Sequence, residues 1–268
     1  MLFSVVVATY NRASHLPALI AALAGQDLPR EEFEVILVDD GSPEPVGSFP
    51  GIRVIRQENR GSGAARMTGV EQARGRFVAF TDDDCRPVPG WLSRLKAVLQ
   101  DDPDTAVAGP TINAVAANAY SAMTQEIVSH LVQAGDFAPT CNLTFPAERL
   151  RQLRGFDPAW RLAAGEDREL CSQWIASGGK IVFDPQVRVM HHHALTLGEF
   201  VRQHFAYGRG ACMVRQKKLA VQPFGLGRFV QERVLKQPDA MKALLCFGIA
   251  QTATAAGFAR ERAARALS

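Results

Sequence analysis

The sequence predicts an α/β fold: a mostly parallel, Rossmann-like sheet flanked by helices and followed by a helical C-terminal extension. Short β-branched runs alternate with segments of helical period through about residue 100, an order typical of βαβ units. The runs are almost wholly apolar, as expected of parallel strands covered on both faces. With 268 residues, 47% of them hydrophobic and 21% charged, the chain is long enough to bury a substantial core.

The N-terminal part contains these elements in regular order. Strand-length runs at residues 3–8 and 34–38 enclose residues 14–26, where leucines recur at helical spacing. The alternation continues with an expected strand at 52–57, a helix at 63–75 and a strand at 76–81.

The alternation weakens after residue 104, so a second part of different architecture is expected there. A helix is predicted over residues 165–179, because Glu166 and Asp167 stand in its first turn and Gly178 stands at its end. Residues 180–193 then have the composition of one or two strands.

Charge is unevenly distributed along the chain. Residues 1–201 contain 18 Lys and Arg against 24 Asp and Glu, whereas residues 202–268 contain 12 against 3. A basic tail favours an anionic partner such as a membrane surface, and solvated helix faces explain it equally well. The sequence has no zinc-finger spacing and no interleaved basic and aromatic pattern, so a nucleic-acid partner is not expected.

The apolar stretch at residues 243–259 is short for a membrane span and is interrupted by Gln, Thr and Gly. Lys242 precedes it and Arg260 follows it, which is typical of a helix lying at a membrane interface. A packed terminal helix is the other interpretation.

The cysteines and the N-terminus bear on location. Five cysteines, an odd number without a CxxC pair, predict neither a disulfide framework nor a structural zinc site, and they favour a reducing compartment. The first residues have the pattern of a buried strand rather than of a signal peptide. A cytoplasmic location is therefore expected.

Three consecutive carboxylates, Asp82, Asp83 and Asp84, follow the expected strand at 76–81. Like charges crowded at a strand end repel one another, and a divalent cation such as Mg²⁺ or Mn²⁺ would relieve that repulsion. Ligands of open parallel sheets collect beyond the carboxyl ends of the strands, so the position favours a metal site. A Pro-rich turn that begins the next helix is the alternative interpretation.

Two further clusters carry candidate chemistry. Glu166 and Asp167 are either first-turn acids favoured by the helix dipole or the place of a general base. Alternation in a strand would put His191 and His193 on one face, where either histidine could be a metal ligand, or the run is a solvent-facing cluster. The first expected strand is followed by no glycine, which argues against a nicotinamide-binding site.

Several of these motifs occur together in a recognisable order. They are "SVVVATYNR", "EVILVDDGS", "NRGSGAARMTG", "TDDDC", "GFDPAW" and "GEDREL". The set resembles the inverting family 2 glycosyltransferases of bacteria, which have a GT-A-type fold, over about residues 3–210. The resemblance implies a catalytic domain at 1–210, with a nucleotide-binding half at 1–104 and an acceptor-binding half at 105–210. Residues 211–268 would form a basic helical extension, either membrane-associating or packed.

The resemblance also implies roles for single residues. Asp167 would be the catalytic base, and Asp84, with His191, would bind the metal. Glu166 and Arg209 are candidate contacts to the diphosphate or the acceptor, although a packed terminal helix explains Arg209 as well. The nucleotide sugar would be held by Ala8, Thr9, Tyr10, Asp39, Arg66, Asp82 and Asp83.

The implied activity is metal-dependent transfer of a sugar, with inversion, from a UDP, GDP or dTDP donor to an acceptor hydroxyl, with Mg²⁺ or Mn²⁺ as the cofactor. Such an enzyme would serve glycan, glycolipid or secondary-metabolite biosynthesis in the cytoplasm, either free or peripheral at the cytoplasmic face of the inner membrane. A nucleotidyltransferase is the alternative enzyme, but the glycine-rich, lysine-containing signature that it needs near residue 10 is missing. A non-catalytic nucleotide-sugar-binding or membrane scaffold protein is the other alternative, and the intact Asp84 and Asp167 argue against it.

Overall fold

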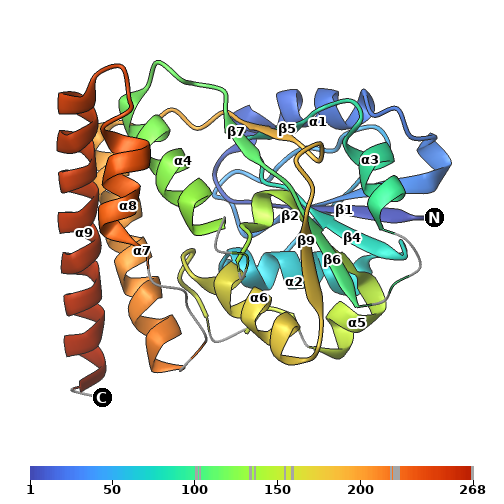
Figure 1. The fold of residues 1–268 in the computed structure, drawn as a ribbon. Helices are drawn as coiled ribbons and strands as arrows, with labels where there is room; N and C mark the ends of the chain where they lie inside the picture. The colour runs from blue at the N-terminus through green and yellow to red at the C-terminus, as the bar shows by residue number, and fades with distance from the viewer. Residues whose placement is uncertain are drawn as a thin grey trace. The chain divides into compact units, whose positions relative to one another are not determined.

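The computed structural model describes residues 1–99, 102, 104–132, 135, 137–153, 155–157, 160–217, 219 and 224–266. The chain divides into two compact units. The first unit comprises Met1–Ile112 and Ala138–His191, and the second comprises Asn113–Phe137 and His192–Ser268. The first unit is built around β-strands and the second mainly from helices (Figure 1).

A seven-stranded sheet in the order β3-β2-β1-β4-β8-β6-β9 forms the centre of the first unit. Only β8 runs antiparallel to its neighbours, β4 and β6, while the other paired strands are parallel, so the expected mostly parallel sheet is confirmed. The strands are β1 (Phe3–Thr9), β2 (Phe33–Asp39), β3 (Ile52–Arg56), β4 (Phe77–Phe80), β6 (Thr105–Ala108), β8 (Leu143–Pro146) and β9 (Lys180–Phe183).

Helices cover both faces of this sheet. In Figure 1, α1 and α3 lie on one side of it, and α2, α5 and α6 lie on the other. The α-helices are α1 (Leu16–Ala24), α2 (Ser62–Gln72), α3 (Trp91–Val98), α5 (Ala147–Gln152) and α6 (Glu166–Ala176). Short 3-10 turns are η1 (Ala13–His15), η2 (Arg30–Glu32) and η3 (Thr140–Asn142). The helices predicted over 14–26, 63–75 and 165–179 correspond to η1 with α1, to α2 and to α6.

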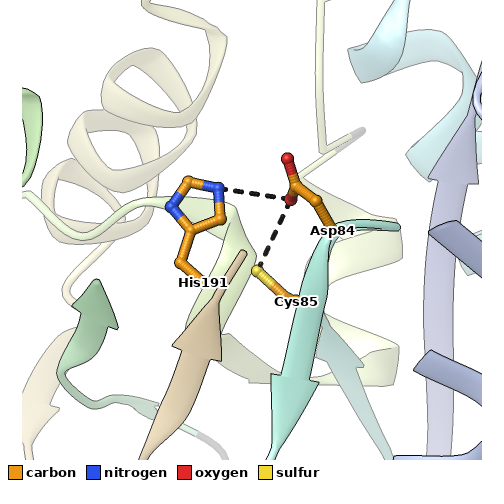
Figure 2. A group of neighbouring side chains, drawn as sticks. All are labelled: Asp84, Cys85 and His191. Atoms are coloured by element: carbon orange, nitrogen blue, oxygen red, sulfur yellow. Dashed lines mark hydrogen bonds and ion pairs between the residues drawn. The ribbon is translucent and has the colours of Figure 1, made fainter. Parts of the chain in front are cut away.

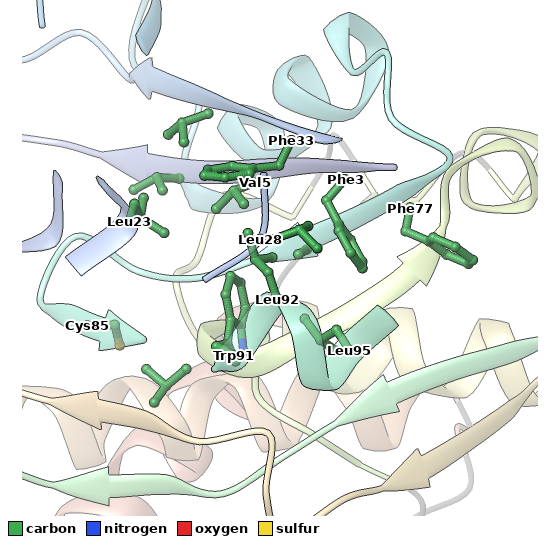
Figure 3. Packing of buried hydrophobic residues seen from close by; sticks show 14 of the residues in the cluster. Phe3, Val5, Leu23, Leu28, Phe33, Phe77, Cys85, Trp91, Leu92 and Leu95 are labelled. Atoms are coloured by element: carbon green, nitrogen blue, oxygen red, sulfur yellow. The ribbon is translucent and has the colours of Figure 1, made fainter. Parts of the chain in front are cut away.

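Alternate residues of β1 face the two helical layers. Val5 belongs to a buried cluster that also contains Leu23 of α1 and Trp91 of α3 (Figure 3). Val6 points the other way, toward α2, where a Cβ added at Gly69 would overlap the Val6 side chain. A glycine at this position therefore lets α2 lie close against β1, and both faces of the strand are buried as the unbroken apolar run predicts.

A second, three-stranded sheet carries the segment after the acidic cluster. Its order is β5-β10-β7, with β5 (Cys85–Pro87), β10 (Val189–His191) and β7 (Thr111–Asn113). Residues 180–193 thus form two strands in two different sheets, β9 and β10. They are separated by a turn in which Asp184 accepts a hydrogen bond from the backbone amide of Gln186.

The second unit packs helices around one apolar cluster that includes Met123, Phe200 and Phe247. Gly208 allows close contact between α7 and α9, because a Cβ there would collide with the carbonyl oxygen of Thr254. The elements are α4 (Ala119–Val132), α7 (Leu197–Gln216), α8 (Leu226–Phe229), the π-helical turn η4 (Val230–Val234) and α9 (Ala240–Ala266).

Residues 243–259 lie within α9, so the expected terminal helix is confirmed. None of the helices within the described ranges has the combination of length and apolar character that crossing a membrane requires. The expected boundary at residue 210 falls inside α7, whereas the boundary between the compact units follows residue 191. The division of roles between residues 1–210 and 211–268 stays a prediction.

Candidate active site

Asp83 follows β4 and turns toward the end of β1. Thr9 donates a hydrogen bond of 2.7 Å to Asp83 Oδ2, and Arg12 Nη1 lies 3.2 Å from Asp83 Oδ1. Burial raises the pKa of Asp83 to about 6, helped by the charges of Asp84 and Asp82 and opposed by Arg12 and Thr9. The parallel register of β1 and β4 thus brings two polar strand ends into direct contact.

Asp84 is held between two basic side chains. Arg12 Nη2 donates to Asp84 Oδ2 at 2.6 Å, and His191 Nε2 lies 3.2 Å from Asp84 Oδ1 (Figure 2). Antiparallel pairing sets His191 of β10 opposite Cys85 of β5, which explains why His191 reaches Asp84. Burial alone would lower the pKa of His191, but its hydrogen bond and charge interaction with Asp84 raise it to about 9. The contact with Asp84 therefore favours the protonated form of the His191 imidazole.

Asp84, Cys85 and His191 each offer one possible metal-ligand atom, and these atoms lie within 4.8 Å of one another. A hydrogen bond with Cys141 and burial both raise the pKa of the Cys85 thiol well above its usual value, so Cys85 is the poorest ligand of the three. The remaining pair of a carboxylate oxygen and an imidazole nitrogen suits a divalent ion such as Mn²⁺, with other positions left for water and phosphate. Asp84 and His191 thus fit a metal, provided that His191 gives up its proton.

A buried arginine connects the acidic cluster to α6. Arg66, on α2, lies with Nη2 2.8 Å from Asp82 Oδ1 and with Nη1 3.3 Å from Glu166 Oε1. Ser62 donates to the same Glu166 oxygen at 2.8 Å. Burial alone would lower the pKa of Arg66, but the charges of Asp82 and Glu166 raise it above its ordinary value. The guanidinium therefore stays charged. Within the described part of the chain its Nε is buried without a hydrogen-bond partner.

Asp167 stands beside this contact in the first turn of α6. Gly165, with φ of 89°, precedes the helix, and the backbone amide of Arg168 donates to Asp167 Oδ1 at 2.9 Å. Burial and the charge of Glu166 raise the pKa of Asp167 and Arg66 lowers it, which leaves the pKa at about 7. The residue as a whole is partly exposed, while its carboxyl group is buried enough for its pKa to be raised.

Asp39, the last residue of β2, and Asp40 after it both accept hydrogen bonds from other parts of the protein. Asp39 is fully buried; it accepts a hydrogen bond of 2.9 Å from the Ser42 amide and pairs with Arg56 Nη1 at 2.7 Å. Burial alone would raise the pKa of Asp39, but these hydrogen bonds and the Arg56 charge lower it. Asp40 accepts from the backbone amide of Gly61 at 2.8 Å, which anchors the start of α2. Contact between Asp39 and a nucleotide would require part of this loop to move, and it stays a prediction.

The other predicted site residues are spread more widely. Ala8 is half-buried at the end of β1, and Tyr10, 47% exposed, follows that strand. Arg209 lies in the second unit, where its Nε is 2.8 Å from Glu261 Oε2, as the packed-helix interpretation expects. His193 also belongs to the second unit, and its carbonyl accepts a hydrogen bond from Ser121. Of the two candidate histidines, His191 is the one next to Asp84.

Sequence reasoning missed two contact residues. Arg12 lies inside the quoted "SVVVATYNR", directly after the strand end, and Ser62 lies inside "NRGSG". Arg12 could have been found from the sequence, because it is a basic residue just after a strand that ends at the same sheet edge as the three acids. In "GFDPAW", Pro158 and Ala159 lie outside the described residues.

The mostly parallel sheet, with antiparallel β8 inserted beside β4 and with acids at the strand ends, defines a GT-A-type fold. The model of the family described as glycosyl transferase family 2 matches residues 4–152, so the chain belongs to that family. The sequence-based assignment of fold and family is confirmed.

Relatives and solved structures agree with this assignment. The chain is 29% identical over 227 residues to the pre-mycofactocin glycosyltransferase of Mycobacterium tuberculosis, which covers 78% of this chain and 46% of the relative. It is 27% identical over 225 residues to the glycosyltransferase AglE of Haloferax volcanii, covering 79% of this chain and 73% of AglE. The chain thus spans about half the length of the mycobacterial relative.

Among solved structures, the chain is similar to the mannosyltransferase PcManGT of Pyrobaculum calidifontis in complex with GDP-Man and Mn²⁺. That match has a TM-score of 0.63 and 21% identity and covers 99% of this chain and 80% of the other. The chain is also similar to TarS of S. aureus, with a TM-score of 0.56 and 18% identity over 94% of this chain and 49% of TarS. At this identity the matches establish the fold.

Proposed function

We propose that the protein is an inverting glycosyltransferase that moves a sugar from a nucleoside-diphosphate sugar to an acceptor hydroxyl. The observation that carries the proposal is the position of Arg66, which contacts Asp82 of the acidic cluster and Glu166 beside Asp167. A donor bound at the acids would therefore lie near the Asp167 carboxylate. Family membership favours sugar transfer over nucleotidyl transfer.

Asp167 is the proposed base. It would accept the proton of the acceptor hydroxyl as that oxygen attacks the anomeric carbon, and a base works best when its pKa lies near the working pH. The pKa of Asp167, raised by burial to about 7, meets that condition. Direct attack from the face opposite the leaving group would invert the anomeric centre, with no covalent intermediate.

Asp84 and His191 are the proposed metal ligands, with Asp82 and Asp83 facing the donor. A bound Mg²⁺ or Mn²⁺ would supply positive charge for the leaving diphosphate. Two structural relatives were crystallised with Mn²⁺, PcManGT with GDP-Man and GalNAc-T7 with UDP and GalNAc, which supports a divalent ion and a nucleotide donor. Thr9, Ala8, Tyr10 and the loop of Asp39 would then form the nucleotide side of the site.

Calorimetry with UDP, GDP and dTDP, each with and without Mn²⁺, tests the donor site. One of these nucleotides should bind with Mn²⁺, and Asp84→Ala should abolish the metal-dependent part of binding. Asp102→Ala is the matched control and should bind as the parent does. It removes an exposed carboxylate outside the site whose two oxygens accept hydrogen bonds from the Asp104 amide and the Thr105 hydroxyl. Absence of binding for every nucleotide in both conditions would remove the chemical basis of the proposal.

Peripheral contact with an anionic membrane at the cytoplasmic face is a further part of the proposal. Met241 is 77% exposed and Leu245 is 65% exposed, one helical turn apart on α9, and Lys242 lies beside them. The free, buried cysteines support a reducing compartment. Synthesis of a glycan, glycolipid or secondary metabolite would suit such a location.

Flotation with vesicles that contain phosphatidylserine tests this contact. The double variant Met241→Gln and Leu245→Gln should float less than the parent, whereas Ala21→Gln, at an exposed position of α1 in the first unit, should not differ. Equal flotation of all three proteins would reject membrane contact through this face.

A further inference from the structure

We propose that Arg12 is a built-in counter-cation, which neutralises Asp83 and Asp84 in the metal-free protein and must yield when a divalent ion binds. The inference rests on the metal site of the proposed function and adds a residue that controls access to it. It predicts that the free protein binds the metal weakly and that the metal enters together with the nucleoside diphosphate.

The Arg12 guanidinium contacts two carboxylates at once. One guanidinium nitrogen lies 3.2 Å from Asp83 Oδ1, and the other lies 2.6 Å from Asp84 Oδ2. A bidentate contact to one carboxylate would neutralise one acid, whereas this arrangement holds two neighbouring acids together. A divalent ion performs the same task between adjacent carboxylates.

Burial shows why such a cation is needed. The side chains of Asp83 and Asp84 are 5% and 3% exposed, so each would be strongly destabilised as an unpaired anion. Asp82 is neutralised separately by Arg66. Among the described residues, Arg12 is an arginine that contacts both of these buried acids.

Arg12 is also placed to leave. Its side chain is 35% exposed, so the guanidinium can regain water, whereas the buried carboxylates cannot. His191 Nε2 approaches the other oxygen of Asp84, Oδ1, so each oxygen of Asp84 already has a basic side chain beside it. A doubly charged ion on Asp84 would repel the guanidinium a few ångströms away. Added diphosphate would reduce that repulsion by bringing negative charge.

Binding of Mn²⁺ alone, followed through the electron paramagnetic resonance signal of the free ion, tests the proposal. Arg12→Gln should bind Mn²⁺ at least about tenfold more tightly than the parent, because a competing charge has been removed. Added UDP or GDP should increase Mn²⁺ affinity more in the parent than in Arg12→Gln.

Arg94→Gln is the matched control. Arg94 pairs with buried Asp184 at 2.6 Å and its side chain is 38% exposed, so it resembles Arg12 in geometry and exposure but lies outside the acidic cluster. Its removal should lower stability and leave Mn²⁺ affinity as in the parent. Arg12→Lys, whose single ammonium cannot bridge both acids, serves if Arg12→Gln does not fold, and its affinity should lie between those of the parent and Arg12→Gln.

The outcomes distinguish a failure of the Arg12 proposal from a failure of the metal site. Unchanged or weaker Mn²⁺ binding in the Arg12 variants, with the parent binding Mn²⁺, would overturn the role of Arg12 and leave the metal site in place. Failure of every protein to bind Mn²⁺, with and without nucleotide, would overturn both the metal site and the counter-cation.

Discussion

At the strand ends of the first unit, buried carboxylates are paired with guanidinium groups. Arg66 contacts Asp82 and Glu166, and Arg12 joins the two acids that follow Asp82. In the core of the second unit, His204 is 2% exposed and lies against the ring of Phe200, and burial lowers its pKa to about 4. The first unit thus gathers several paired charges at one sheet edge, whereas at His204 the second unit keeps a buried base neutral.

This difference indicates what each region is built to do. Pairs of buried charges are a weak source of stability, because the loss of hydration offsets most of their attraction. A protein that holds several of them at one sheet edge has an arrangement suited to a charged ligand. A neutral buried histidine that is hydrogen-bonded to Thr124 and packed against Phe200 has no such charge to offer a ligand.

Removing the proposed base should have the largest effect. Asp167→Asn should reduce sugar transfer by about 100- to 10,000-fold, because the amide cannot accept the acceptor proton. Nucleotide binding should stay nearly unchanged, which calorimetry on the same variant would check. Comparable transfer rates for Asp167→Asn and the parent would show that the paired region has another base.

Removing the central cation of the paired region should lower stability. Arg66→Gln leaves Asp82 and Glu166 without their common partner, and we expect the free energy of unfolding to fall by about 3–5 kcal/mol. Urea unfolding measures this loss. Arg60→Gln, at an exposed arginine of the preceding loop, should change stability by less than about 0.5 kcal/mol and is the control.

Arg66→Gln should also shift the pH dependence of sugar transfer. A base must be ionised, so the rate of the parent should rise with pH through about 7, the pKa to which burial raises Asp167. Arg66 lowers that pKa, so its loss should move the rise to higher pH. An unmoved profile in Arg66→Gln would contradict the electrostatic link between the two residues.

The smallest effect is expected in the second unit. Because the pKa of His204 is lowered from its ordinary value of 6.5 to about 4, the unfolded chain takes up a proton before the folded one does. Stability should therefore fall as pH decreases from about 6.5 to about 4, by up to about 3 kcal/mol. His204→Gln should lose this part of the slope when unfolding is measured across that range. Parallel slopes would indicate that His204 is protonated in the folded protein.

The central sheet and much of the candidate site could be predicted because local patterns specify them. Apolar runs fix β1, β2 and β4, and parallel strands bring their polar ends to one edge, so the closeness of Thr9 to Asp83 follows from chain order. The place of Asp167 in the first turn of α6 follows from helix-start signals.

The remaining contacts depend on pairings that no local pattern encodes. Strand β8 has four residues and no clear period, so its antiparallel insertion beside β4 was not predicted. The closeness of His191 to Asp84 depends on the pairing of β10 with β5. The contact between Arg66 and Glu166 joins residues 100 positions apart.

Gly69 affects where the Arg66 side chain lies. It lies one turn after Arg66 on the same helix, at the point where α2 meets Val6 most closely. A larger residue there would push the helix outward and carry the guanidinium away from Asp82, although every acid would remain in the sequence. A relative that keeps all of its acidic motifs but has a bulky residue at this position should therefore be tested for activity before it is grouped with the active enzymes.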